Sequence, residues 1–156
     1  AVLGICGGYQ MLGKTVSDPQ GIEGPPAETA GLGLLDVETT LTAAKKLIEV
    51  SGTARQTGTP VSGYEMHVGV TVGPDTAQPM LTLLSGSDGA VSGDGSVSGS
   101  YVHGLFSSDA FRTAFLQRLR PAAREAMAYE AGIDATLDAL ADHLEAHLDL
   151  EAMIDG

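Results

Sequence analysis

The stretch LGICGGYQMLG, residues 3–13, constrains the fold of this chain more than any other feature. The chain opens with the apolar run AVLGI, which is typical of a buried parallel strand, and GYQMLGKTV has the composition of a short helix. Gly4, Cys6 and Gly8 match the glycine–nucleophile–glycine spacing of a sharp strand-to-helix turn, where we expect glycine to relieve crowding. The stretch therefore predicts an α/β fold with Cys6 raised out of the sheet.

Cys6 is the one cysteine of the chain, so it cannot form an internal disulfide and its thiol is free for chemistry. The start of a helix favours thiolate over thiol, and the N–H of Gly7 would face the oxyanion formed when sulfur attacks a carbonyl. Two other interpretations stay open: a buried core cysteine and a phosphate-binding loop. Residues 13–15, GKT, lack the upstream glycine spacing of such a loop.

Charge and length narrow the class of protein. Eight basic residues against twenty acidic ones give a net charge of −12, so we expect neither nucleic acid nor an anionic membrane as a partner. No apolar stretch has the length of a membrane span and the start does not resemble a signal peptide, which predicts a cytoplasmic protein. The chain begins inside its first expected strand, so we expect residues 1–156 to be the C-terminal portion of a larger domain.

A cysteine nucleophile needs a general base, and four histidines are candidates. His143 and His147 are four residues apart on an expected helix, but no third ligand accompanies them, so we expect no metal site. His67 lies within an expected strand. His103 ends the second of two strands joined by the turn GDG, a position where catalytic residues collect in parallel-sheet proteins. We therefore favour His103 as the base.

Residues 62–73, SGYEMHVGVTVG, alternate as a strand does. Tyr64 and Met66 share one face, where we expect core packing, and Glu65 and His67 share the other. Elsewhere we expect a loop over residues 17–33 and a strand over residues 34–42. Two helices should follow, one capped by Ser108 and one amphipathic over residues 134–155 and packed on a core.

The motifs GICGGYQMLG, GYEMHVG and SYVHGLF, in this order, resemble the glutamine amidotransferase domain of cobyric acid synthases, within the class I, Cys-His type of amidotransferases. The segments DPQGIEGPP and GLGLLDVETTL extend this resemblance over nearly the whole chain. It implies a flavodoxin-like layered sheet with flanking helices, with the N-terminal part of the domain lying outside this chain.

The resemblance also implies roles for residues. Cys6 would attack the side-chain amide of glutamine to give a glutamyl thioester and ammonia, with His103 as the base. The implied substrate-binding residues are Gly7, Gly8, Gln10, Tyr64, Glu65 and His67. Many class I members carry a glutamate two residues after the histidine, where this chain has Leu105. We hypothesise that Glu65 helps to position the Cys-His pair instead.

In the whole enzyme that the resemblance implies, ATP and Mg²⁺ act in an upstream synthetase domain, and no cofactor belongs to this chain. Ammonia would amidate adenosylcobyrinic acid a,c-diamide on the way to cobalamin, with the corrin bound outside this chain. The expected partners are therefore glutamine and that upstream domain, and we expect the chain by itself to be weakly active or inactive. Three alternatives stay open: a cobyrinic acid a,c-diamide synthase-type domain, an inactive binding or assembly module, and pairing of a sheet edge with a second copy.

Overall fold

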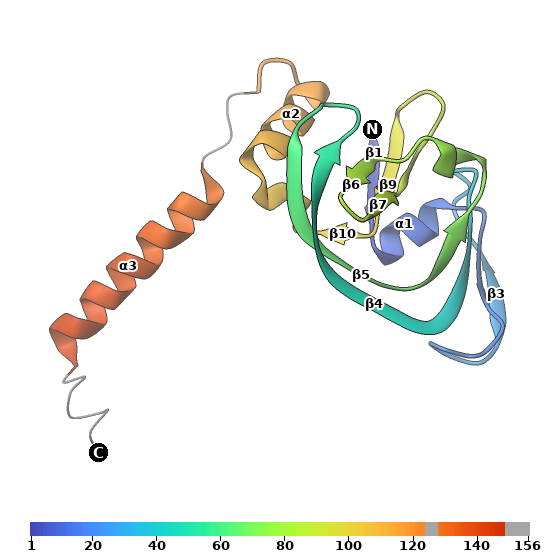
Figure 1. Ribbon diagram of the computed structural model, residues 1–156, viewed down its shortest axis with the longest axis horizontal. Coiled ribbons are helices and arrows are strands. Elements are labelled where there is room, and N and C mark those ends of the chain that lie inside the picture. Colours follow the sequence, from blue (N-terminus) through green and yellow to red (C-terminus); the bar gives the residue numbers. More distant parts are fainter. Residues whose placement is uncertain (124–127, 149–156) are drawn as a thin grey trace.

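The structure, a computed structural model, describes residues 1–123 and 128–148 (Figure 1). The strands are β1 (Val2–Ile5), β2 (Thr15–Asp18), β3 (Ala27–Ala30), β4 (Glu38–Ala54), β5 (Pro60–Val72), β6 (Leu81–Leu83), β7 (Gly86–Asp88), β8 (Ala90–Val91), β9 (Val97–Ser100) and β10 (Val102–His103). The helices are α1 (Gly7–Leu12), α2 (Asp109–Leu119) and α3 (Tyr129–His147), and the 3-10 turns are η1 (Pro74–Ala77) and η2 (Leu105–Ser107). The fold is the mixed α/β class predicted from the sequence.

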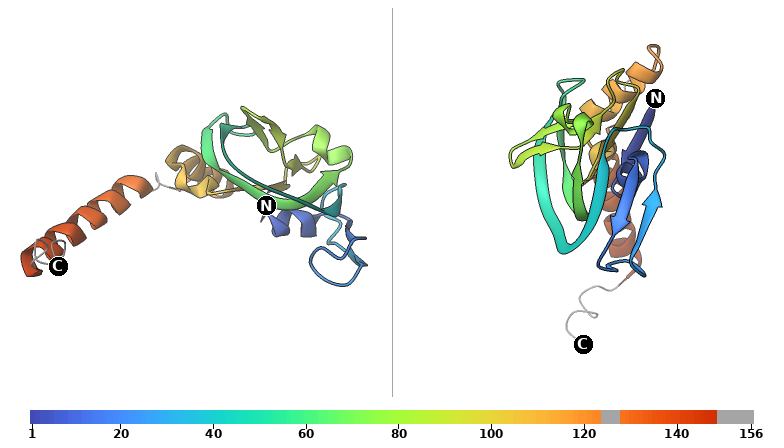
Figure 2. Two further views of the ribbon diagram at one scale, coloured as in Figure 1. Left: turned by 60° about the horizontal axis from the view of Figure 1, so that its bottom comes forward. Right: turned by 90° about the vertical axis from the view of Figure 1, so that its right-hand side faces the viewer.

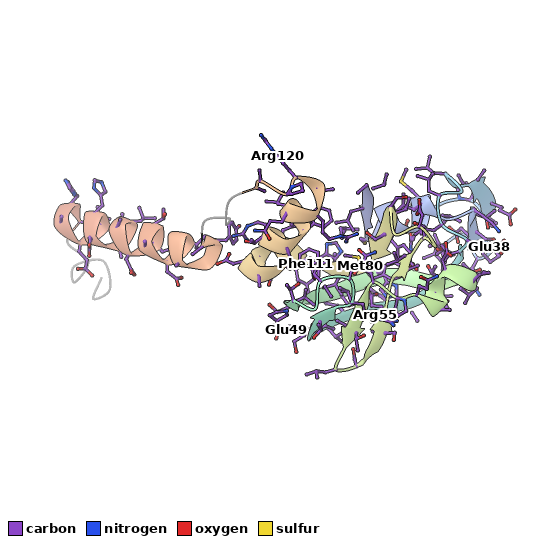
Figure 3. The ribbon with its side chains drawn as sticks, turned by 90° about the horizontal axis from the view of Figure 1, so that it is seen from above. Glu38, Glu49, Arg55, Met80, Phe111 and Arg120 are labelled. Carbon is purple, nitrogen blue, oxygen red and sulfur yellow. The ribbon has the colours of Figure 1, made fainter. Side chains whose placement is uncertain are left out.

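The strands form two sheets. The smaller has the order β1-β9-β8, with β1 parallel to β9 and β8 antiparallel to it. The larger follows the path β10-β5-β4-β2-β3, and β6 and β7 are attached to it at β4. Figures 1 and 2 show β4 and β5 as a long curved pair around the smaller sheet and α1. Figure 3 shows Glu38 and Glu49 well apart along β4. The register of β4 with β5 shifts between Thr40 and Lys45, as at a β-bulge.

One corner of the chain joins the two sheets. Strand β9 ends at Ser100 in the smaller sheet, and β10 begins at Val102 in the larger one. The prediction that His103 ends the strand directly after the turn GDG is therefore wrong, because His103 ends the separate strand β10, which is antiparallel to β5. At the start of this corner Ile5 is in register with Ser100, and after it His103 is in register with Tyr64. His103 is therefore only three residues along the chain from Ser100, which pairs with Ile5, the residue directly before Cys6.

The core consists of two clusters of buried side chains. One contains Met80 and Phe111, which lie near each other in the middle of Figure 3 and attach α2 to the sheets. The other contains Tyr9, Leu12 and Tyr101, and it holds α1 against the smaller sheet. The predicted N-cap of α2 is confirmed, because the N–H of Phe111 donates to the hydroxyl of Ser108.

The amphipathic C-terminal helix forms, but the expectation that it packs on a core is wrong for the described residues. Helix α3 begins at Tyr129, projects away from the rest of the molecule, and exposes the stripe that contains Leu137, Leu140 and Leu144 (Figures 1 and 2). Periodicity identifies the apolar face of a helix but not the surface that covers it. The last residues of the predicted helix, 149–155, lie outside the described residues.

Two further boundaries differ from those predicted. The expected loop 17–33 includes the end of β2 and all of β3, which pair as an antiparallel hairpin. The Asp18 carboxylate accepts the N–H groups of Ile22 and Glu23, so it organises the connection between these strands. The strand expected over residues 34–42 begins at Glu38 and continues to Ala54. None of the described helices is both long enough and apolar enough to cross a membrane.

Candidate active site

The strand-to-helix turn predicted at Cys6 is present. Cys6 has a φ of 55°, and in the described residues it is the one non-glycine residue with a positive φ. Such a conformation costs of order 1–3 kcal/mol and persists where the surrounding structure enforces it. A Cβ at Gly4 would lie 2.6 Å from both the carbonyl oxygen of Gly8 and a methyl of Leu12. Glycine is therefore needed at position 4 for α1 to follow so closely.

The expectation of crowding at Gly8 itself is wrong. A Cβ built there meets no atom within 4 Å, and the same holds for Gly7. The backbone of Gly8 leaves no room for a side chain at position 4, so Gly4 is the residue that must be small.

The Cys6 thiol is half-buried and points at the long strand β5. Its Sγ donates to the carbonyl oxygen of Met66 at 3.2 Å, while the Cys6 N–H donates to the carbonyl of Ser100 at 2.9 Å. A thiol that is partly exposed and directed at a polar atom differs from the inert cysteine of an apolar core. This environment disfavours the core-cysteine interpretation.

His103 is held against the same strand. Its ring stacks on that of Tyr64, with centroids 5.0 Å apart and planes 4° from parallel. The backbones approach so closely that a Cβ at Gly63 would lie 1.9 Å from the His103 carbonyl oxygen. The Nε2 of His103 is buried and has no hydrogen-bond partner among the described residues, which is unusual for a buried polar atom.

Cys6 and His103 therefore meet β5 two residues apart, at Met66 and Tyr64. Two residues span about 7 Å of a strand. Within the described part of the chain the thiol bonds to Met66 and makes no hydrogen bond to His103. In apo sites such catalytic hydrogen bonds are often long and tighten when substrate binds. The structure gathers the predicted nucleophile and base along one short stretch of β5.

His67 is differently placed. Its Nε2 lies 2.9 Å from a carboxylate oxygen of Glu65, its Nδ1 lies 3.1 Å from the carbonyl of Gly69, and its ring stacks on Tyr101 with centroids 3.8 Å apart. Both ring nitrogens of His67 are thus occupied, whereas one ring nitrogen of His103 is not. This difference favours His103 over His67 as the base.

Glu65 is buried and positions His67, so the structure does not place it as the positioning group of the Cys-His pair. Its other carboxylate oxygen lies 2.7 Å from Nζ of Lys46. Burying an acid is tolerated where it is paired and hydrogen-bonded in this way.

The opposite face of β5 carries Tyr64, which is 42% exposed, so the expectation that Tyr64 packs in the core is wrong.

Gln10 connects α1 to β5. Its side-chain N–H donates to the carbonyl of Val68 at 3.0 Å and to the hydroxyl of Tyr101 at 3.4 Å. The Tyr101 hydroxyl also bonds to that of Thr71 at 2.5 Å, and burial raises the pKa of Tyr101. Sequence reasoning gave no role to Tyr101, although it lies inside the motif SYVHGLF; its neighbours Gln10 and His67 become evident only in three dimensions.

A cavity of about 450 Å³ opens beside His103, within the usual size range of small-molecule sites. The residues that line it are Ile5, Val102, His103, Gly104, Leu105, Phe106, Ser107, Arg112 and Tyr129.

The rings of His143 and His147, the pair considered as metal ligands, stack on each other in α3. Across residues 1–123 and 128–148, no three His, Cys, Asp or Glu side chains gather as metal ligands would.

Comparison with known proteins identifies the family. The sequence profile of the CobB/CobQ-like glutamine amidotransferase domain matches residues 1–111, a segment that contains both Cys6 and His103. This chain belongs to the CobB/CobQ-like glutamine amidotransferase family. Membership agrees with the resemblance noted from the three motifs.

Three relatives with high sequence identity to this chain are named cobyric acid synthase. The chain is 60% identical over 154 residues to the cobyric acid synthase of Methylorubrum populi, covering 98% of this chain and 31% of that protein. It is 55% identical over 150 residues to that of Hyphomonas neptunium, covering 96% and 30%. It is 53% identical over 154 residues to that of Jannaschia sp., covering 99% and 32%. The chain spans about a third of the length of these relatives.

Proposed function

We propose that this chain is the glutamine-hydrolysing part of a cobyric acid synthase, with Cys6 as nucleophile and His103 as general base. The observation that carries the proposal is the strained elbow at Cys6 facing the same stretch of β5 as a histidine whose ring nitrogen has no hydrogen-bond partner in the described part of the chain. A nucleophile and a base held by one strand are the minimum that acyl transfer requires.

In the first step the Cys6 thiol gives its proton to Nε2 of His103 and the sulfur attacks the side-chain carbonyl carbon of glutamine. A C–S bond forms, and the negative charge moves to the carbonyl oxygen. The N–H groups of Gly7 and Gly8 begin α1 and have no partner within a helix, so they can donate to this oxygen. One such donor lowers a barrier by about 3–4 kcal/mol.

In the second step the C–N bond breaks and the nitrogen takes the proton from His103, which releases ammonia and leaves a thioester on Cys6. His103 then accepts a proton from water, whose oxygen attacks the thioester carbon. Breaking the C–S bond releases glutamate, and the sulfur takes the proton held by His103, which restores the thiol and the neutral imidazole. The same imidazole therefore serves as base and acid in turn.

The use of the ammonia lies outside this chain. In the synthetase portion, ATP with Mg²⁺ would activate carboxylates of adenosylcobyrinic acid a,c-diamide for amidation. The name shared by the relatives supports this assignment over that of a cobyrinic acid a,c-diamide synthase. A cytoplasmic location stays a prediction.

The decisive experiment is labelling with 6-diazo-5-oxo-L-norleucine, a glutamine analogue that alkylates a nucleophilic cysteine. The chain by itself and the chain fused to the upstream portion of the Methylorubrum populi relative are both treated, and mass spectrometry locates the label. We expect label on Cys6, none in Cys6→Ala, and protection by glutamine. If neither form is labelled, the chain is a binding or assembly module instead.

A further inference from the structure

Asp88 is a buried acid that the proposed reaction does not use. It ends β7, the residue is 7% exposed, and it forms no ion pair with any described residue. Its carboxylate accepts the hydroxyl of Ser100 at 2.5 Å and the backbone N–H of Tyr101 at 3.3 Å. An acid buried among neutral donors is costly, and desolvation raises the pKa of Asp88.

Ser100 is fully buried and connects to both halves of the candidate site. Its carbonyl accepts the N–H of Cys6 at 2.9 Å. Its hydroxyl accepts the N–H of Val102, the residue before His103, at 3.0 Å, and donates its own proton to Asp88. Ser100 thus contacts the nucleophile residue on one side and the strand of the base on the other.

These bonds lie where the chain leaves one sheet for the other. At such a corner the N–H groups of Tyr101 and Val102 turn away from the β9 ladder and need other partners. A serine hydroxyl has one proton, so giving it to Asp88 leaves the lone pairs for Val102. Because the Asp88 carboxylate can only accept, it fixes which group donates in each bond: the N–H of Val102 donates to the hydroxyl of Ser100, which donates to Asp88.

We propose that Asp88 and Ser100 are positioning residues that set where His103 lies relative to Cys6. This inference rests on the proposed function, because it assigns the pair its effect through the Cys-His reaction. Both residues are buried, so we assign neither a contact with the substrate. Their effect is on the direction in which β10 leaves the corner, and hence on the placement of the imidazole.

The test compares Ser100→Ala with wild type in the diazo-oxo-norleucine reaction, using whichever form of the protein reacts faster. Ser100→Ala removes both hydroxyl bonds but keeps the backbone bond to Cys6. We expect the maximal labelling rate to fall about 10- to 100-fold, the size that small misplacements cause, with an unchanged half-saturating concentration. Asp88→Asn, which preserves the side-chain volume, should also lower the maximal labelling rate. It tests the inference if Ser100→Ala does not fold.

Ser98→Ala is the matched control, because Ser98 is buried in the same strand and takes no part in these bonds. It should label like wild type. Folded fractions from circular dichroism correct each rate, so lost stability alone cannot imitate the result. Wild-type labelling rates in both Ser100→Ala and Asp88→Asn would overturn the inference and leave the proposed function intact.

A second readout is independent of glutamine chemistry. Cys6 is alkylated with iodoacetamide while the ring ¹H–¹⁵N signals of His103 are followed by NMR. We expect these signals to move in wild type and Ser98→Ala and to move less in Ser100→Ala. An equal response in all three proteins, or none in wild type, contradicts the positioning role, even where the diazo compound labels nothing and the proposed function fails.

Discussion

The ring of Tyr64 lies flat on the ring of His103, with 5.0 Å between centroids, although Tyr64 itself is largely at the surface. Tyr64 was expected either to line the glutamine pocket or to pack in the core. Its observed place covers one face of the imidazole, whose Nε2 remains buried. The stacking restricts rotation of the imidazole and so contributes to holding that nitrogen toward the interior.

This arrangement predicts that ring shape matters at position 64 and the phenol does not. Tyr64→Phe should keep the glutaminase rate of wild type, because a phenyl ring stacks equally well. Tyr64→Ala should lower kcat on the order of tenfold, since the imidazole becomes free to rotate. Glutamate release under steady-state conditions measures both. Equal rates for the two variants would contradict a role for the stacked ring.

Substitutions of His103 and His67 should have very different effects on kcat. His103→Gln should lower kcat by about 10²–10⁴-fold, the usual contribution of a general base. His67→Gln should lower it far less, because both nitrogens of His67 are already engaged by Glu65 and Gly69. Single-turnover release of ammonia compares them. A larger loss in His67→Gln than in His103→Gln would mean that the base has been wrongly assigned.

Gly4 and Gly8 offer a matched pair for stability. A Cβ at position 4 would collide with the backbone of Gly8 and the side chain of Leu12, so Gly4→Ala should lower the free energy of unfolding by about 1–3 kcal/mol. Gly8→Ala meets no atom and should raise it by roughly 0.5–1 kcal/mol, since alanine favours the helix. Urea unfolding measures both. Similar losses in the two variants would exclude the proposed crowding.

The turn between β8 and β9 predicts a pH-dependent contribution. Hydrogen bonds from Ser92 and Ser96 hold the pKa of Asp94 at about 2, below its usual 3.8. A depressed pKa means that its stabilisation is complete above about pH 4 and disappears as the pH falls through 2. Asp94→Asn should therefore be less stable than wild type at pH 7, with a difference that shrinks toward pH 2. A difference that is constant with pH would exclude the carboxylate as its cause.

Helix α3 should contribute little to the stability of the rest of the chain. Leu140 is exposed on α3, so Leu140→Lys should change the free energy of unfolding by less than about 0.5 kcal/mol. Phe111→Ala, which empties a position buried between α2 and the sheets, should cost about 3–5 kcal/mol. Thermal unfolding followed by near-UV circular dichroism compares the two. A large loss in Leu140→Lys would show that the apolar face of α3 is covered in solution.

The features predicted correctly are those encoded by neighbouring residues. Glycine spacing around Cys6, the serine before α2 and the turn GDG each depend on a few consecutive positions, and each is observed. The motifs that contain Cys6 and His103 were likewise sufficient to indicate the family. The site assignments of these two residues stay predictions until the labelling is done.

The sequence by itself determined the elbow at Cys6, the mixed α/β class and the family. Only the tertiary structure decided that Glu65 is buried and His67 partly buried while Tyr64 faces outward, and that Asp88 supports the corner at Ser100. Alternation distinguishes two faces of a strand but does not say which one is buried, because a polar face can be buried once its charges are paired. That pairing depends on residues from other strands, such as Lys46, whose proximity is created by folding.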